Sequence, residues 1–223
     1  MIYGSTIGKK FHEDGMVRRY PGNTVVADIL PGNPAYRVMC RLRQMVIDMG
    51  LTSHIILLPA DSYHMTLIQG VNDQVRKETH WPAGVSLDTP MEKMDEIVST
   101  AYSKAALPGP VRMRFDTISI SKTACIIRLH PADAEQSRIL WDFRDRAADN
   151  LGMRLPGHEA YRFHISLGYV WKVAEGEIAE KMEQLKEKIN AYIATQPEFW
   201  TAAPYMAYYD DMHAFSSERI PRD

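Results

Sequence analysis

The sequence lacks the features of membrane-embedded, disulfide-stabilised and strongly basic proteins. Only two of its 223 residues are cysteines, Cys40 and Cys125, and no CxxC pair occurs, so we expect reduced thiols. No run approaches the roughly 18 apolar residues of a membrane span, and the N-terminus has no hydrophobic signal segment. The net charge is −2, whereas binders of long duplex nucleic acid are usually basic. These absences favour a cytoplasmic protein that contacts no membrane and argue against long duplex nucleic acid as a partner, which leaves a small phosphorylated ligand or an RNA end open. We expect a monomer.

Glycine and proline punctuate a regular order of expected elements. Apolar periodicity predicts helices over 34–50, 90–107, 132–152 and 174–196, and strands over 24–30, 54–59, 111–121, 123–130, 161–171 and 203–215. A further strand is expected at the stretch YHMTLIQG, residues 63–70. The order of elements repeats once along the chain and predicts an α+β fold with antiparallel sheets and two related lobes. We expect one domain over 1–223, with a covering segment over about 1–22.

The stretch YHMTLIQG places His64 and Thr66 at alternate positions of an apolar run. In a strand these two side chains point to the same face, and the residues between them point to the core. One such pattern also fits an ordinary surface histidine. However, the stretch YRFHISLGY repeats it one hundred residues later with His164 and Ser166. The repeat predicts that each half supplies one imidazole and one hydroxyl to a shared cleft.

This set of groups suits phosphodiester chemistry. Two imidazoles with a pKa near 6.5 can act as general base and general acid at neutral pH. The hydroxyls of Thr66 and Ser166 can bind the phosphoryl oxygens. The arrangement requires no metal or other cofactor, and no zinc-protease, P-loop or dinucleotide-binding motif is present.

The paired tetrapeptides HMTL (64–67) and HISL (164–167) resemble the H-x-T/S motifs of the two-histidine (2H) phosphoesterase superfamily. That superfamily includes 2′,3′-cyclic phosphodiesterases and LigT-like RNA ligases. The stretches GKKFHEDG (8–15), YPGNT (20–24), LPADSYHMTL (58–67) and YRFHISLGY (161–169) resemble an uncharacterised bacterial and fungal subfamily of it. The resemblance implies two pseudo-symmetric lobes of antiparallel sheet with flanking helices around a central cleft. It also implies metal-independent cleavage or transfer at a cyclic phosphate or phosphodiester.

Four further residues are candidates for substrate binding. Arg162 would share the strand face of His164, although a solvated arginine at a strand start is an equal alternative. Tyr169 should point to the core unless the strand bulges past Gly168, a glycine that would leave room for a ligand. Lys10 and Asn23 belong to glycine-rich stretches that could cover the cleft, or serve as ordinary loop and turn residues.

We therefore expect a hydrolase that opens a 2′,3′-cyclic phosphate of a nucleotide or RNA end, with one histidine as base and the other as acid. The alternatives are RNA ligase-type transfer in the same cleft, a non-catalytic binder of nucleotides or RNA ends, and a metal-dependent phosphoesterase. Substrate identity resides in loops, where the sequence carries little information.

Overall fold

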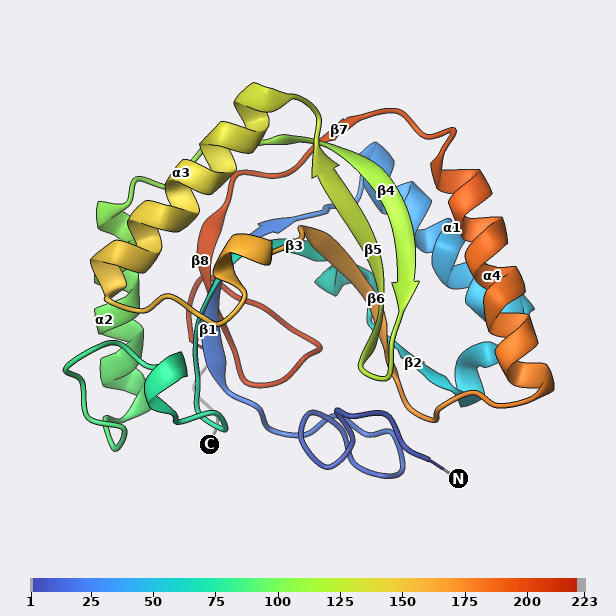
Figure 1. Cartoon of the computed structure of the whole chain (residues 1–223), viewed down its shortest axis with the longest axis horizontal. Helices are drawn as coiled ribbons and strands as arrows, with labels where there is room; N and C mark the ends of the chain where they lie inside the picture. The colour runs from blue at the N-terminus through green and yellow to red at the C-terminus, as the bar shows by residue number, and fades with distance from the viewer. Residues whose placement is uncertain (1, 220–223) are drawn as a thin grey trace.

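The computed structural model describes residues 2–219, so the ends of the expected domain, residues 1 and 220–223, lie outside it. The described chain is α+β, with an eight-stranded sheet and four α-helices (Figure 1). The strands are β1 (Gly22–Asp28), β2 (Ile55–Leu57), β3 (His64–Asn72), β4 (Arg112–Ile120), β5 (Ala124–Pro131), β6 (His164–Val170), β7 (Phe199–Trp200) and β8 (Tyr205–Tyr209). The helices are α1 (Pro34–Asp48), α2 (Met91–Lys104), α3 (Ala134–Leu151) and α4 (Glu177–Ile193). None of these helices combines the length and hydropathy needed to cross a membrane.

Local capping explains why the helices occupy their predicted places. The Asn33 side chain accepts a hydrogen bond from the first turn of α1, and Asp133 does the same for α3. Gly152 caps the C-terminal end of helix α3, and its φ of 63° is the left-handed conformation that glycine adopts readily. The last strand is shorter than expected: β8 ends at Tyr209, and the chain turns back so that Ser216 pairs with Tyr208.

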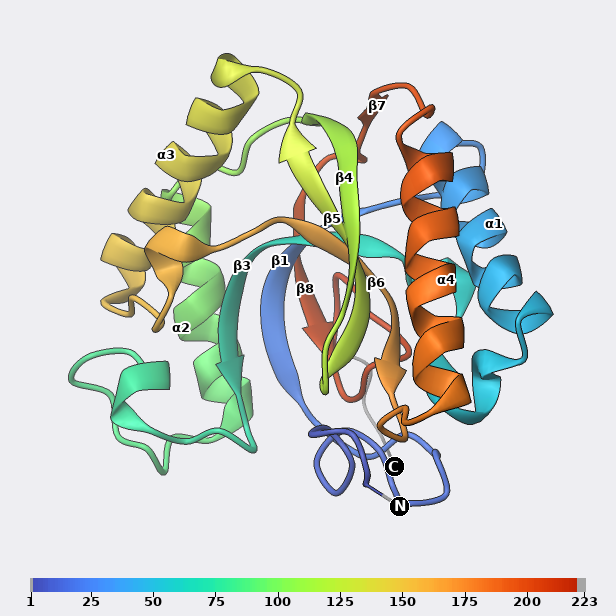
Figure 2. The same ribbon diagram turned by 45° about the vertical axis from the view of Figure 1, so that its right-hand side comes forward.

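The strands pair antiparallel in the order β7-β4-β5-β6-β3-β1-β8, with β2 added beside β6. Helix α1 lies beside α4 and helix α2 beside α3, so the two pairs occupy opposite flanks (Figures 1 and 2). The main core lies between these helices and the sheet. Met65 and Leu67 of β3, and Ile165 and Leu167 of β6, are fully buried in it. The alternate residues of both strands therefore face away from the helices.

The pairing of β5 with β6 repeats the pairing of β1 with β3, one hundred positions later. In the first pair Val26 lies opposite Thr66 and Asp28 opposite His64; in the second pair Ile126 lies opposite Ser166 and Arg128 opposite His164. The register shift also recurs, after Val25 and after Cys125. Strands β3 and β6 meet through the pair Met65–Ile165. One continuous sheet therefore carries both motifs side by side.

Candidate active site

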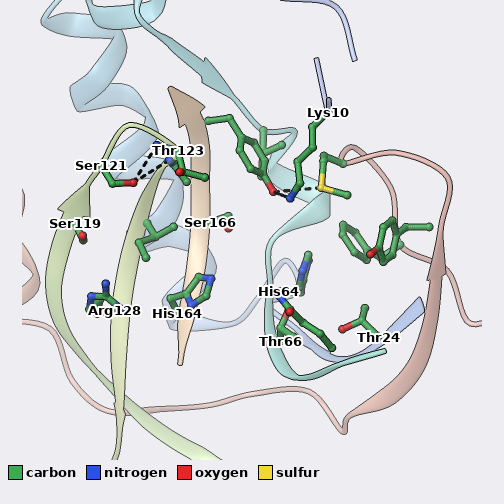
Figure 3. Close-up of a pocket in the computed structure, with 18 residues that line it drawn as sticks. Lys10, Thr24, His64, Thr66, Ser119, Ser121, Thr123, Arg128, His164 and Ser166 are labelled. Atoms are coloured by element: carbon green, nitrogen blue, oxygen red, sulfur yellow. Dashed lines mark hydrogen bonds between the residues drawn. The ribbon is translucent and has the colours of Figure 1, made fainter. Parts of the chain in front are cut away.

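A cavity of about 330 Å³ lies on the face of the sheet that carries both histidines. Its walls come from β1, β3, β6, the β4–β5 hairpin and the segments near both ends of the described chain (Figure 3). His64, Thr66, His164 and Ser166 all line it. The volume is at the lower end of the range for small-molecule sites, about 300–1,000 Å³. The four motif residues thus share one pocket of the size that suits a small ligand.

Both imidazoles are held in the same way by their own backbone. The Nδ1 atom of His64 lies 2.8 Å from the carbonyl oxygen of Ser62, and that of His164 lies 2.9 Å from the carbonyl oxygen of Arg162. A carbonyl oxygen can only accept, so each Nδ1 carries the proton and donates it. In the neutral ring Nε2 is then the basic atom. Both histidines are fixed in the tautomer that leaves Nε2 free to exchange a proton with a ligand.

The two hydroxyls lie diagonally across the junction of β3 and β6. Because these strands run antiparallel through Met65–Ile165, the register brings Thr66 toward His164 and Ser166 toward His64. A short 3-10 helix precedes each motif strand, at Ala60–Ser62 and at His158–Ala160. The hydroxyl of Tyr161 donates to the carbonyl of Thr66 at 3.0 Å. That bond ties the approach to the second motif to the strand of the first.

Burial makes both imidazoles weaker bases than free histidine. Desolvation lowers the pKa of His64 to about 4, assisted by the charge of His164 and opposed by the hydrogen bond to Ser62. The pKa of His164 is also lowered, chiefly by desolvation and then by the cations Arg128 and Lys10. At neutral pH both rings of the free protein are therefore neutral. A bound phosphate would raise both pKa values, because an anion favours the protonated ring.

The N-terminal segment covers one end of the cavity. Phe11 is fully buried in a small cluster with Leu58, Tyr169 and Met212. The neighbouring Lys10 lines the cavity and donates to the hydroxyl of Tyr169 at 3.1 Å. Burial lowers the pKa of Lys10, but nearby phenols, Tyr169 first among them, outweigh this effect and raise it. Lys10 therefore keeps its positive charge at neutral pH.

Tyr169 lines the cavity because β6 is irregular at the position that the sequence left open. Cys125 lies opposite Gly168 but Ile126 lies opposite Ser166, so Leu167 has no partner on β5. This bulge turns Tyr169 to the cavity side. We expected from the sequence that Gly168 would leave room for a ligand, but it does not. A Cβ atom there would lie 2.4 Å from the carbonyl oxygen of Ile56, so the glycine permits the close approach of β2.

The segment after β8 also lines the cavity, and it packs against the N-terminal segment. The ring of Phe215 packs on His64 with centroids 4.1 Å apart, and it also contacts Tyr209. Met212 of the same segment is buried. Sequence reasoning missed these contacts because it continued the last strand through residue 215. The return of the chain after Tyr209 is what brings Phe215 over the first motif.

Two expected substrate-binding residues do not reach the cavity. Asn23 is buried elsewhere: its side chain donates to Asp95 and accepts from the backbone of Val71, which satisfies it within the protein. Arg162 precedes β6, which begins at His164, and its side chain is exposed outside the cavity lining. Its contribution to the site is the backbone carbonyl that orients His164.

Arg128 is a cavity residue that sequence reasoning did not identify. It lies on β5 directly opposite His164 and lines the cavity. The available signal was the alternation of 123–130: its odd-numbered residues Cys125, Ile127 and Leu129 are buried, so Arg128 must face the other side. The pairing of β5 with β6, which puts Arg128 opposite His164, is a long-range contact. The alternation within one strand does not predict it.

One group of side chains in the described part of the chain is close enough to share a metal ion, namely Asp145, His158 and Glu159. It lies outside the lining of the cavity, and the guanidinium of Arg154 already binds Asp145 and Glu159. His158 also contacts Asp145 at 2.9 Å. These groups satisfy one another as an ion-pair network.

The chain is similar to known proteins in both sequence and structure. A family profile described as "2H-phosphodiest: Domain of unknown function (DUF1868)" matches residues 10–124, which include the first motif. The chain is similar to the conserved protein of unknown function ATU0111 from Agrobacterium tumefaciens, with 28% identity and a TM-score of 0.83 over 96% of this chain and 91% of that one. Similarity to E. coli LigT complexed with 3′-AMP is 10% identity and a TM-score of 0.45, covering 86% and 88% of the two chains. For TT0787 of Thermus thermophilus the values are 13% and 0.45, covering 84% and 85%. No curated protein matches significantly.

Proposed function

The chain belongs to the 2H phosphoesterase superfamily, and from that premise we propose that it is a metal-independent phosphoesterase acting on a cyclic phosphate or phosphodiester of a nucleotide or RNA end. One observation carries the proposal. Two imidazoles on neighbouring strands line one cavity, and a backbone carbonyl holds each through Nδ1 so that Nε2 is the exchanging atom. A protein that only binds phosphate needs donors and positive charge, but not two oriented bases.

In the proposed reaction, water attacks the phosphorus of a 2′,3′-cyclic phosphate. One neutral imidazole takes a proton from the water as its oxygen bonds to phosphorus. The other imidazole, protonated beside the bound anion, gives its proton to the ribose oxygen as the P–O bond breaks. The product is a phosphate monoester, and the two rings have exchanged protonation states. Ligation would be the same chemistry with a ribose hydroxyl in place of water.

The remaining cavity groups have supporting roles in this reaction. Thr66 and Ser166 donate to the non-bridging oxygens, where negative charge develops. The charged Lys10 adds electrostatic stabilisation from the covering segment, and Tyr169 holds it there. The repeated register of β1–β3 and β5–β6 supports a pseudo-twofold arrangement of two lobes around the cleft. Such symmetry puts a base and an acid on opposite sides of phosphorus, as in-line displacement requires.

The test is hydrolysis of a panel of 2′,3′-cyclic nucleotides and short RNAs with cyclic-phosphate ends, in the presence of EDTA. We expect turnover by the wild type and none by the double variant His64→Ala/His164→Ala, which controls for contaminating enzymes. Activity that EDTA abolishes would instead support a metal-dependent phosphoesterase. If the wild type hydrolyses no member of the panel, the proposed substrate class is wrong.

A further inference from the structure

We propose that the cleft contains a second anion site at Arg128, so that the preferred substrate carries a phosphate group besides the one that is cleaved. This inference rests on the proposed function, because it places the cleaved phosphate between the two histidines. The two phosphates would occupy neighbouring parts of one cavity.

The order of the strands separates Arg128 from the reacting centre. Strands β5, β6 and β3 are neighbours in that order, and they carry Arg128, His164 and His64 respectively. Arg128 pairs with His164 across β5 and β6, so it lies on the side of His164 away from His64 (Figure 3). A phosphate held between the two imidazoles is therefore on one side of His164, and the guanidinium is on the other.

The guanidinium of Arg128 is available to a ligand. Among residues 2–219 it has no hydrogen-bond or ion-pair partner, although it is half-buried in the cavity wall. Arg112 and Arg219, in contrast, each bind carboxylates of the protein. A guanidinium offers five donors in a planar fork that matches a phosphate. A bound anion would therefore pair with a guanidinium for which the described protein supplies no counter-charge.

The charge of the cavity also exceeds what one cyclic phosphate needs. Its described lining contains two permanent cations, Lys10 and Arg128, and no carboxylate. A cyclic phosphodiester carries a single negative charge, and Lys10 is already placed by Tyr169 and lies over the ring of Tyr20. One cation therefore remains without a counter-charge. A second phosphate, with a charge of about −1.5 to −2 when it is a monoester, would supply it.

When no anion is bound, the positive charge of Arg128 also opposes the protonation of His164 that the proposed reaction needs. Arg128 lowers the pKa of His164, which disfavours the protonated ring. Yet each ring must carry a proton at one stage of the proposed cycle. A phosphate on Arg128 neutralises the guanidinium and removes this penalty. Strand β4 supplies a further hydroxyl on this side, because Ser119 lies opposite Ile126, two residues from Arg128 on β5, and also lines the cavity.

Two sources of the second phosphate share this chemistry: the 5′-phosphate of the same nucleotide, and the phosphodiester that joins the preceding nucleotide of an RNA end. The test is calorimetric binding of adenosine 3′-monophosphate, adenosine 3′,5′-bisphosphate and the dinucleotide ApAp, whose 3′-terminal phosphate stands for the product of hydrolysis. We expect the bisphosphate, the dinucleotide or both to bind the wild type at least about tenfold more tightly than the monophosphate, as charge-assisted bonds allow. Arg128→Gln should remove that advantage while leaving the affinity for the monophosphate within about threefold.

Two variants act as controls. Arg128→Lys keeps the charge but loses the fork, so it should retain only part of the advantage. Lys188→Gln makes the same charge change at an exposed position on α4, outside the cavity lining, and should bind all three ligands as the wild type does. The melting temperature of each variant checks its fold.

The outcomes separate this inference from the proposed function. If neither doubly phosphorylated ligand binds more tightly than the monophosphate, or if Arg128→Gln weakens all three equally, the second anion site is wrong even when cyclic phosphates are hydrolysed. If the Arg128-dependent advantage is present but no cyclic phosphate is hydrolysed, the anion site stands and the proposed reaction fails.

Discussion

Acidification should destabilise the protein through His64 in particular, and the variant His64→Asn isolates this effect. Asparagine keeps a side-chain N–H donor near the position of Nδ1, so the hydrogen bond to Ser62 can persist while the titratable group is lost. The pKa of His64 falls to about 4 in the folded protein because burial disfavours its charged form. In the unfolded chain it returns to about 6.5. Between these two values the unfolded state binds more protons than the folded state.

The sign and size of the effect follow from this difference. Stability must rise with pH through the window from about 4 to 6.5 and be unaffected by His64 above it. Lowering a pKa from about 6.5 to about 4 corresponds to about 3 kcal/mol at full effect, at about 1.36 kcal/mol for each tenfold change. At pH 5 the unfolded histidine is mostly protonated and the folded one is mostly neutral. The expected loss of stability between pH 8 and pH 5 from His64 alone is then about 2 kcal/mol.

Urea unfolding of the wild type and His64→Asn at pH 8 and pH 5, followed by tryptophan fluorescence, measures this contribution. Each protein loses some stability between pH 8 and pH 5. All other titrating groups are common to both proteins, so the difference between their two losses reports the contribution of His64. We expect the wild type to lose about 2 kcal/mol more than the variant on acidification. Equal losses in the two proteins would show that the ring is not desolvated and would refute the electrostatic description of the site.

Two further predictions concern the groups around the histidines. Thr66→Val and Ser166→Ala should each lower kcat/KM by about a hundredfold, because each removes one donor to the developing charge. The melting temperature of each variant should change little. Wild-type turnover in both variants would exclude the hydroxyls as phosphate ligands. Phe215→Ala should raise the pKa of His64 toward its ordinary value of about 6.5, because the Phe215 ring packs on the imidazole and excludes water from it. NMR titration of the imidazole measures this pKa. An unchanged value would show that Phe215 is not what desolvates His64.

The motif residues were predictable from the sequence because they depend on strand periodicity alone. The alternation of HMTL and of HISL fixes which side chains face the core, and the structure reproduces it in both strands. The repeat at a spacing of one hundred residues suggested that the two strands are equivalent, and the shared register of their neighbours agrees. This alternation is a local property of each strand, so it can be read from the sequence without knowing how the strands pair.

The residues whose place the sequence left open, or that sequence reasoning missed or misplaced, depend on irregular or long-range pairing. Asn23 lies at a register shift between β1 and β3, where its side chain bonds to the backbone of Val71 beside Gly70. Tyr169 reaches the cavity only because β6 bulges. Arg128 becomes part of the site through the pairing of β5 with β6, and Phe215 through the return of the chain after β8. A single sequence does not specify these contacts.

The most direct test of the account is turnover by the single variants His64→Ala and His164→Ala on the best cyclic-phosphate substrate of the wild type, in EDTA. The two-histidine mechanism uses a base and an acid in every cycle, so each variant should lose at least about a hundredfold in kcat while melting as a folded protein. The double variant should be little worse than either single variant, since the two rings act as a unit. Near-wild-type turnover by either single variant would contradict the two-histidine mechanism.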